Sequence, residues 1–347
     1  MIEKYFSATH VADLSRFSGF TVSGPDANTF LQGQLTNDVT GLGLGGHQRS
    51  GYCTPKGRLL ATMLQWRIDD QTLGHLIASE LLEPTVKRLK MFVLRSKLVF
   101  SDATKPLRAF GLWGSAASGL APGTTIALAD SGAWLLIDSP CPVLGARAWC
   151  ILSLDHEAQI GQLLTQHEQR PQAAWMFSEI QNAKAWVGEP TTEAFVPQMI
   201  NFELTNGVSF TKGCYPGQEV VARSQYLGKL KRRSFRAQLS ETSLLSRSPG
   251  LTSDSQTESS ATEFNLATYA QGLVGKDVWS ASSSHEACGL VVNAAPVFSA
   301  LGVQLSAIDL LVETSLDAWA KQDLHVGAID GPSLDSQPMP YEFPAAE

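Results

Sequence analysis

The sequence predicts an α+β protein that ends in a smaller all-β domain. Up to Arg236, strand-like runs alternate with segments whose apolar residues recur at helical spacing. After Arg236 the pattern changes to short apolar or alternating runs, which are typical of a β-barrel or sandwich. A chain of 347 residues is too long for one ordinary core, so we expect several structural units.

The N-terminal elements follow from local periodicity and turn residues. We predict, in order, a strand at 21–23, a turn at 24–26, a short helix with Phe30 and Leu31, half-buried strands at 58–68 and 74–78, a helix at 80–94 and a strand at 97–100. A second long helix is expected over 174–187, because Met176, Ile180, Ala183 and Val187 then share one face.

The C-terminal third contains the predicted β-domain. Its expected strands lie at 274–279, 288–292 and 310–313. Residues 240–262 include 12 Ser or Thr among 23 positions, a composition that buries too little surface to order itself. We therefore expect a flexible insertion there, and an extended, Pro-rich surface tail from Gly331 onward.

Composition restricts the class of protein. With 44% hydrophobic and 17% charged residues the chain resembles soluble globular proteins, and no apolar run is long enough to span a bilayer. The first residues lack the pattern of a signal peptide, so we expect a cytoplasmic protein that does not contact membranes. The net charge of −7 argues against generalised nucleic-acid binding.

One segment departs from this acidic balance. Between Thr211 and Arg236 there are seven cations against one anion, Glu219. Such a segment can receive an anionic ligand tail or a phosphate backbone, or it can be a solvated strand edge whose lysines discourage pairing. The sequence leaves both interpretations open.

Five cysteines lie at 53, 141, 150, 214 and 288, without a C-x-x-C pair or zinc-ribbon spacing. An odd number in a chain without an export signal predicts free thiols. The seven histidines show no metal or triad spacing either. We therefore predict no metal site formed by this chain alone.

The cysteine motif, residues 212–219 (Lys-Gly-Cys-Tyr-Pro-Gly-Gln-Glu), is the most informative stretch. Pro216 suits the first position of a helix and Gly228 its end. The helix dipole and Lys212 then both favour a Cys214 thiolate, with a thiol pKa below the usual value of about 8.5. The alternative, a structural cysteine beside a tight turn, has equal weight on these residues alone.

Two further blocks accompany this motif: 195–201, Phe-Val-Pro-Gln-Met-Ile-Asn, and 31–39, Leu-Gln-Gly-Gln-Leu-Thr-Asn-Asp-Val. Together with 207–219 and the closing 338–341, Pro-Met-Pro-Tyr, they resemble the YgfZ family, bacterial folate-binding proteins described as tRNA-modifying factors that support iron–sulfur enzymes. The block at 31–39 is also similar to the aminomethyltransferases of glycine cleavage. The resemblance extends over nearly the whole chain.

The resemblance implies a ring of two α+β units and a C-terminal β-barrel around a channel that holds tetrahydrofolate or a one-carbon derivative. We place the folate-binding region at 1–236, with subdomains at roughly 1–50 plus 105–236 and at 51–104. The barrel is expected at 237–330, with the insertion at 240–262, and the tail at 331–347.

The resemblance also assigns roles to residues. Cys214 and Lys212 become catalytic candidates. Phe17 and Trp175 match the two folate-contacting aromatic positions, with tryptophan in place of Phe17 in a relative; read alone, Trp175 would be a core aromatic. The other cofactor-binding candidates within the matched blocks are Asn37, Gln198, Glu219 and Arg223.

A departure from the transferases concerns the strand at 57–63. There the aminomethyltransferases carry an acidic pair, whereas this chain has Ala61 and Thr62, which cannot accept a proton from an amine. Lys56 and Arg58 add positive charge beside them, for the glutamate tail of folate or simply at a surface turn.

These observations predict a monomeric, cytosolic tetrahydrofolate-binding protein whose Cys214 maintains or repairs iron–sulfur enzymes of tRNA methylthiolation. Catalytic turnover and direct RNA contact are left open. The alternatives are a folate-dependent methyl- or aminomethyltransferase with its acid–base group elsewhere, and a non-catalytic scaffold that docks an iron–sulfur enzyme through 229–236.

Overall fold

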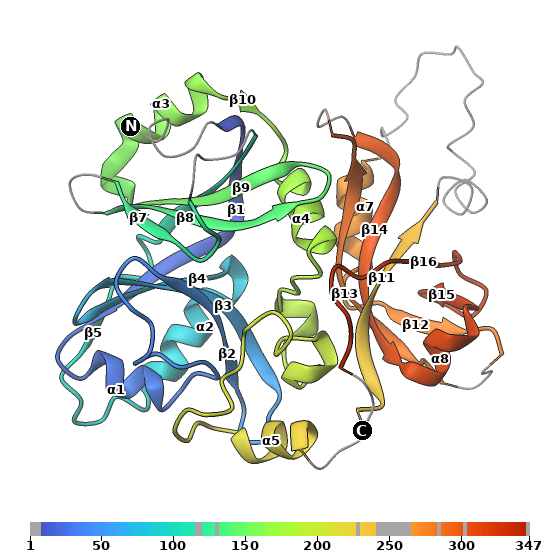
Figure 1. The fold of residues 1–347 in the computed structure, drawn as a ribbon, viewed down its shortest axis with the longest axis horizontal. Coiled ribbons are helices and arrows are strands. Elements are labelled where there is room, and N and C mark those ends of the chain that lie inside the picture. The colour runs from blue at the N-terminus through green and yellow to red at the C-terminus, as the bar shows by residue number, and fades with distance from the viewer. Residues whose placement is uncertain are drawn as a thin grey trace.

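One long strand, β1 (Ala8–Ser23), joins the two halves of the N-terminal sheet. In the computed structural model, which describes residues 8–114, 120–128, 132–226, 230–240, 265–282, 286–300 and 304–344, the first part of β1 pairs with β6 and the last part with β4 (Figure 1). A register shift between Asp13 and Ser18 bends the strand between these pairings. The sheet therefore turns from one half into the other without a break.

The sheet order is β2-β3-β4-β1-β6-β9-β8-β7, with β5 and β10 also paired to β1. The remaining strands are β2 (His47–Cys53), β3 (Leu59–Asp69), β4 (Thr72–Ala78), β5 (Val99–Phe100), β6 (Leu107–Gly114), β7 (Thr125–Ala127), β8 (Ala133–Cys141), β9 (Gly145–Leu152) and β10 (Glu168–Gln169). The predicted strands at 58–68 and 74–78 are confirmed as β3 and β4. β3 is buried along nearly its whole length, so the prediction of a half-buried strand was wrong.

The helices of this region are α1 (Ala27–Gln32), α2 (Ser79–Lys90), α3 (Glu157–Gln166), α4 (Gln172–Gln181) and α5 (Gln218–Tyr226), with short 3₁₀ turns at Leu154–His156, Glu189–Thr191 and Pro197–Ile200. α4 packs against β1 and the barrel strand β13. It stops six residues before the predicted end at 187, because Ala183 adopts a left-handed conformation with φ +47°. Gly111 lies beneath it, and a Cβ there would be 2.3 Å from the Trp175 ring.

The C-terminal unit is a curled sheet in the order β15-β12-β13-β14-β11-β16. Its elements are β11 (Arg232–Leu239), α7 (Leu266–Leu273), β12 (Asp277–Ser280), β13 (Gly289–Phe298), β14 (Gln304–Ser315), α8 (Leu316–Lys321), β15 (Leu324–Val326) and β16 (Asp335–Gln337). The segment before β16 pairs with β15 through Val326 N to Pro332 O, 3.0 Å, and Leu334 N to Leu324 O, 2.8 Å. These bonds join the two ends of the sheet, as in a barrel, which confirms the predicted fold class. Helices α7 and α8 were not predicted from the sequence pattern after Arg236.

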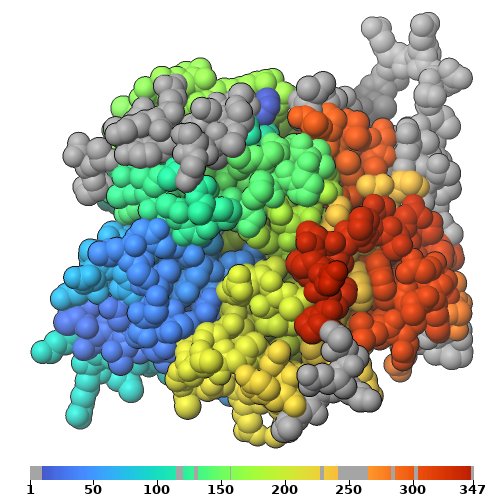
Figure 2. Space-filling view, in the orientation of Figure 1, coloured from blue at the N-terminus to red at the C-terminus, as the bar shows by residue number. Residues whose placement is uncertain are grey.

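Nearly all described residues of the tail are exposed or half-buried, as predicted, but several of its side chains pack inward. Arg236 donates to the Pro338 carbonyl at 2.8 Å, and Met339 and Tyr341 pack against the N-terminal core. Phe343 contacts Phe235 of the barrel with ring centroids 5.4 Å apart. The dark-red tail thus lies between the barrel and the yellow-green central segments (Figure 2).

The proposed boundary near residue 50 falls inside β2, and the two proposed subdomains share one sheet. The boundaries given from sequence remain a prediction. Of the Ser/Thr-rich insertion, all but Ser240 lies outside the described residues.

Asp309 of β14 connects the barrel to the rest of the protein. Its buried carboxylate accepts hydrogen bonds from Gln181 of α4, Arg236 of β11 and Gln238, the last at 2.8 Å. Each of these donors is thus held by one charge in the interior. The Arg236 guanidinium is itself buried and depends on this partner.

We expect Asp309→Ala to lower the free energy of unfolding by about 3–5 kcal/mol, because it leaves the buried Arg236 cation without its carboxylate. Urea unfolding at neutral pH measures this. Asp335→Asn, at an exposed carboxylate of β16, is the control and should change stability by less than about 0.5 kcal/mol. A loss below about 1 kcal/mol for Asp309→Ala would contradict this role.

Candidate functional site

A cavity of about 470 Å³, here called the central cavity, lies where the N-terminal sheet, the loop after α4 and the tail meet. This volume is typical of small-molecule sites. Its walls come from β2, β8, β9, the end of α4, the 204–206 turn and the tail. The lining residues include His47, Arg49, Asp138, Trp149, Glu179, Asn182, Lys184, Trp186, Thr205 and Tyr341.

The fully buried Arg147 side chain organises this wall. Its Nη1 donates to Glu179 Oε1 at 2.5 Å, and its Nη2 to Asp138 Oδ2 at 3.1 Å. Asp138 Oδ2 also accepts from the Trp149 indole at 3.0 Å, and Glu179 Oε2 from the Trp186 indole at 2.6 Å. One guanidinium therefore positions two carboxylates, and each carboxylate holds one tryptophan of the cavity.

The Asp138 carboxylate stays ionised. Burial alone would raise its pKa, but the charges of Lys184 and Arg147 outweigh burial and hold the pKa below its ordinary value. Burial lowers the pKa of Lys184, against the attraction of Asp138, to which its ammonium donates. A carboxylate held in this way is a poor proton donor.

Arg49 places a further cation beside the Trp186 ring. Its guanidinium lies 4.8 Å from the Trp186 ring centroid and donates to the Ala185 carbonyl, while Nη1 is 3.7 Å from Glu179 Oε2. The buried Nε has no hydrogen-bond partner within the described ranges.

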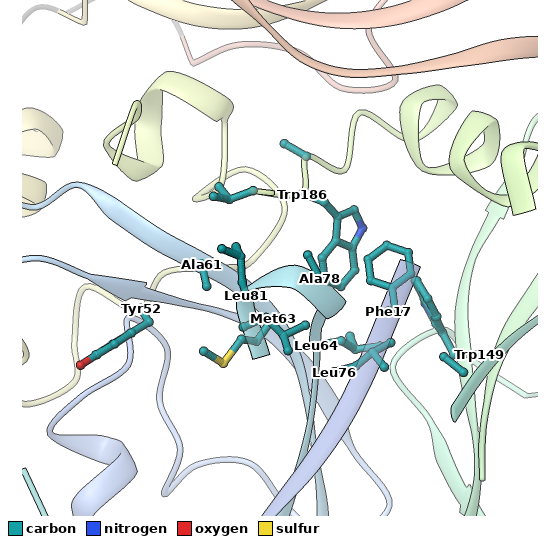
Figure 3. Close-up of a cluster of buried hydrophobic side chains, with 14 of the residues drawn as sticks. Phe17, Tyr52, Ala61, Met63, Leu64, Leu76, Ala78, Leu81, Trp149 and Trp186 are labelled. Atoms are coloured by element: carbon teal, nitrogen blue, oxygen red, sulfur yellow. The ribbon is translucent and has the colours of Figure 1, made fainter. Parts of the chain in front are cut away.

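The two predicted aromatic contacts lie behind the cavity wall. Phe17 packs on Trp149 and Trp186, with ring centroids 5.3 and 4.6 Å apart (Figure 3). Trp175 is fully buried, 4.7 Å from Trp149. Neither lines the cavity, so their contact with folate stays a prediction. The tryptophans that do line it, 149 and 186, were missed, because only the pairing of β9 and the path after α4 bring them together.

Asn37 and Gln198 also lie behind the wall or away from it. Asn37 Nδ2 donates to the carbonyls of Arg49 and Asn206, both at 2.7 Å, and so holds two lining segments together. Gln198 is buried and donates to the Val221 carbonyl at 2.8 Å, which fastens α5. Their predicted role as direct ligands is untested.

Glu219 and Arg223 form an exposed pair on α5, with 2.8 Å between Oε1 and Nη2. Neither residue lines the central cavity. The structure therefore does not bring them together with the tryptophans, and any folate contact by them remains a prediction.

Lys212 fastens the cysteine motif to the 31–39 block. Its ammonium donates to the carbonyls of Gln32 and Leu35, the latter at 2.5 Å, and lies 5.0 Å from the Tyr215 ring centroid. Burial lowers the pKa of Lys212 to about 8, against the attraction of Asp38 and Cys214. The cysteine motif and the block at 31–39 are thus in contact through one side chain.

Cys214 is the exposed one of the five cysteines, and it does not line the central cavity. Cys53, Cys141 and Cys150 are buried, which agrees with free structural thiols at those positions. The structure therefore separates the thiol from the cavity, and the prediction that they act together is untested.

The helix after Cys214 begins at Gln218 rather than at the predicted Pro216. Gly217 has φ +83°, outside the helical region, and a Cβ there would lie 2.4 Å from the Thr54 carbonyl oxygen. Close packing against the turn at 54–57 thus requires this glycine and delays the helix. The predicted stop at Gly228 lies outside the described residues.

The basic segment around β11 is largely neutralised inside the protein, contrary to its interpretation as a docking surface. Arg232 pairs with Glu313 at 2.5 Å, Arg233 with Glu203 at 2.6 Å, and Arg236 with Asp309 at 3.2 Å. Only Lys231 of this stretch is exposed among its described cations from 230 to 236. Lys229 lies outside the described residues.

Ala61 and Thr62, which replace the acidic pair, are both fully buried on β3, with Ala61 in the hydrophobic cluster of Figure 3. The Thr62 hydroxyl accepts from the Val187 amide at 3.0 Å. It therefore supports the loop after α4, which carries Trp186.

Comparison with known structures defines the fold. The fold is that of the aminomethyltransferases: the glycine cleavage system aminomethyltransferase T from Bartonella henselae matches with a TM-score of 0.64 at 12% identity, over 90% of this chain and 80% of that one. No protein-family model matches the chain.

Sequence comparison gives the family. The chain is 32% identical over 240 residues to the tRNA-modifying protein YgfZ of Colwellia psychrerythraea strain 34H, which covers 65% of this chain and 71% of that protein. The corresponding protein of Edwardsiella ictaluri strain 93-146 is 32% identical over 226 residues, 62% of this chain and 66% of that protein. The chain belongs to the YgfZ family. No helix in the described ranges is long and apolar enough to cross a membrane.

His47, in the cavity wall, makes the stability of the folded protein sensitive to acid. Its Nδ1 lies 3.1 Å from the Thr125 hydroxyl, and burial lowers its pKa to about 4, against the attraction of Asp138. The unfolded chain binds a proton at this position near pH 6.5, whereas the folded protein resists it until about pH 4. Falling pH therefore favours the unfolded state across this window.

We expect His47→Gln to reduce the loss of folding free energy between pH 6.5 and pH 4 by about 1–3 kcal/mol. Urea unfolding at several pH values measures the loss for both proteins. Part of it should persist in the variant, since burial also lowers the pKa of His75, to about 3. An unchanged pH dependence would contradict the assignment to His47.

Proposed function

We propose that the central cavity binds tetrahydrofolate or a one-carbon derivative. The observation that carries this proposal is the pair of cavity tryptophans whose indole N–H groups are both tied to carboxylates. Such indoles are held rigidly, and the parts of their rings that border the cavity can contact a flat ligand such as a pteridine. The aminomethyltransferase fold supports the same ligand class.

Several lining residues suit the polar parts of this ligand. Arg49 and Lys184 line the cavity and provide two cations for carbonyl or carboxylate oxygens. Asn182 and Thr205 supply further polar groups. Phe17 and Trp175 would then act from behind, by supporting Trp149. A reduced folate bound here would supply a one-carbon unit carried on its N5 or N10 nitrogen.

Aminomethyl transfer is less well supported. Ala61 and Thr62 provide no acid or base, and the cavity carboxylates Asp138 and Glu179 are already engaged by Arg147, Lys184 and the two indoles. A group held in its charged form by neighbouring cations is badly matched to proton transfer near neutral pH. We therefore favour a folate-dependent support role over turnover of an amine donor.

The second half of the proposed function, the support of iron–sulfur enzymes, depends on the thiol of Cys214. Within the cysteine motif, Lys212, Tyr215 and Gly217 are engaged in packing or hydrogen bonds, whereas Cys214 is exposed. An exposed thiol outside the cavity is accessible to a macromolecular partner. We propose that it acts on iron–sulfur enzymes of tRNA methylthiolation, maintaining or repairing their clusters in the cytoplasm.

Calorimetry with 5-formyltetrahydrofolate tests the first half. Trp186→Leu should weaken binding about 2- to 10-fold, because the ligand loses one stacking face. Trp279→Leu, at a barrel tryptophan outside the cavity lining, is the matched control and should bind like the wild type. Absence of binding by the wild-type protein would refute the folate proposal.

Complementation of a deletion strain tests the second half, with tRNA methylthiolation as the readout. Cys214→Ser should restore little of the modification, because the nucleophilic sulfur is gone. Cys288→Ser, at a half-buried barrel cysteine, should restore it. Full restoration by Cys214→Ala would sink the role of the thiol.

A further inference from the structure

The end of α2 forms a second surface with unusual chemistry. Residues 87–97, Lys-Arg-Leu-Lys-Met-Phe-Val-Leu-Arg-Ser-Lys, hold five cations and no carboxylate in a chain whose net charge is −7. We call this segment the α2 tip. Figure 2 shows the cyan to teal part of the chain that contains it protruding at the lower edge of the molecule.

The cations of the α2 tip are not neutralised by carboxylates of the described residues. None of the five forms an ion pair with another described residue, in contrast to the three paired arginines of β11. Arg88 hydrogen-bonds the Tyr52 hydroxyl, and Lys90 lies 5.8 Å from the Phe100 ring centroid. The Asp26 carboxylate accepts the backbone N–H of Lys97, at 2.6 Å, rather than pairing with the Lys97 ammonium. Thus the local positive charge remains available to a partner.

Large apolar side chains stand among these cations. Leu94 is 90% exposed, Met91 61% and Phe92 46%. Consecutive turns, with Met91 N to Arg88 O at 3.2 Å and Phe92 N to Leu89 O at 3.0 Å, and a left-handed Leu94 at φ +47°, present them in a fixed loop. A monomer gains no stability from such exposure, so a partner that covers these side chains is expected.

A pocket of about 290 Å³ opens beside the α2 tip. Lys87, Arg88 and Met91 line it together with Tyr52, Leu60, Leu81, Pro84, Thr85 and Thr192. Largely apolar walls with two cationic side chains, Lys87 and Arg88, among them suit a flat, polar ring such as an unstacked base.

We propose that the α2 tip is a docking surface for RNA, with the cations at the phosphates and Phe92 against an unpaired base. This inference rests on the proposed role in tRNA modification. Phosphate contacts by lysine and arginine supply most of the affinity for nucleic acid, and exposed rings stack on bases in single-stranded loops. An anionic lipid surface shares the phosphate chemistry, but stable membrane binding needs a longer apolar face than one loop.

Fluorescence anisotropy with an unmodified, end-labelled tRNA transcript tests the proposal on the full chain between 50 and 200 mM KCl. The charge-reversed variant K87E/K90E/R95E should bind at least about 10-fold more weakly. The slope of log affinity against log salt should become shallower by about 2–3, since three phosphate contacts are removed. Phe92→Ala should weaken binding about 5-fold or more without changing the slope.

The matched control is K231E/K276E/K321E, which makes the same charge change at exposed lysines of the barrel unit. It should retain the wild-type affinity and slope. Equal losses in both triple variants, or no binding of the transcript by the wild type, would overturn the proposal. So would tip-dependent sedimentation with phosphatidylcholine–phosphatidylglycerol vesicles (3:1) in the absence of transcript binding.

Circular dichroism and thermal melting check that each variant is folded. The same proteins are then titrated with 5-formyltetrahydrofolate, which the α2-tip variants should bind like the wild type. Loss of RNA affinity with intact folate binding supports the α2 tip specifically. If the wild type binds the transcript but not the folate, the cavity proposal fails while the docking surface stands.

Discussion

The buried guanidinium of Arg147 is the constraint on which the site depends. A cation removed from water is tolerated only where anions and acceptors surround it, and here Asp138 and Glu179 do so from β8 and α4. The same two carboxylates hold the indoles of Trp149 and Trp186. Charge burial thereby sets the shape of an aromatic cavity, because no member of this network can move without leaving another unpaired.

The barrel supports the cavity by holding the backbone of Trp186. Asn293 of β13 exchanges two hydrogen bonds with the backbone of Trp186, at 2.8 and 2.9 Å, and Asp309 holds α4 and β11 together. The tail adds Tyr341 to the cavity wall. The N-terminal region and the tail therefore line the cavity, and the barrel supports it through the backbone of Trp186.

The proposed folate site and the surfaces proposed to meet macromolecular partners lie in different parts of the molecule. The central cavity is enclosed by aromatic and charged groups, whereas Cys214 and the α2 tip are exposed. A folate-loaded core that presents a thiol and a cationic surface to separate partners is consistent with a support role in tRNA modification. The missing acidic pair fits this division, since Ala61 and Thr62 serve packing and the loop of Trp186.

Local periodicity was sufficient for the fold class and for β3, β4 and α2, because apolar spacing and turn residues act over a few positions. The family followed from the sequence blocks around 31–39 and 195–219. Strands β2, β6 to β11, β15 and β16 were not predicted. Local periodicity misjudged the end of α4 and the start of α5, where Ala183 and Gly217 take left-handed conformations imposed by distant packing. Only the tertiary structure decided which tryptophans line the cavity and which cations are free. Arg232 meets Glu313 across 81 positions of sequence, a pairing that the strand register creates and local sequence does not encode.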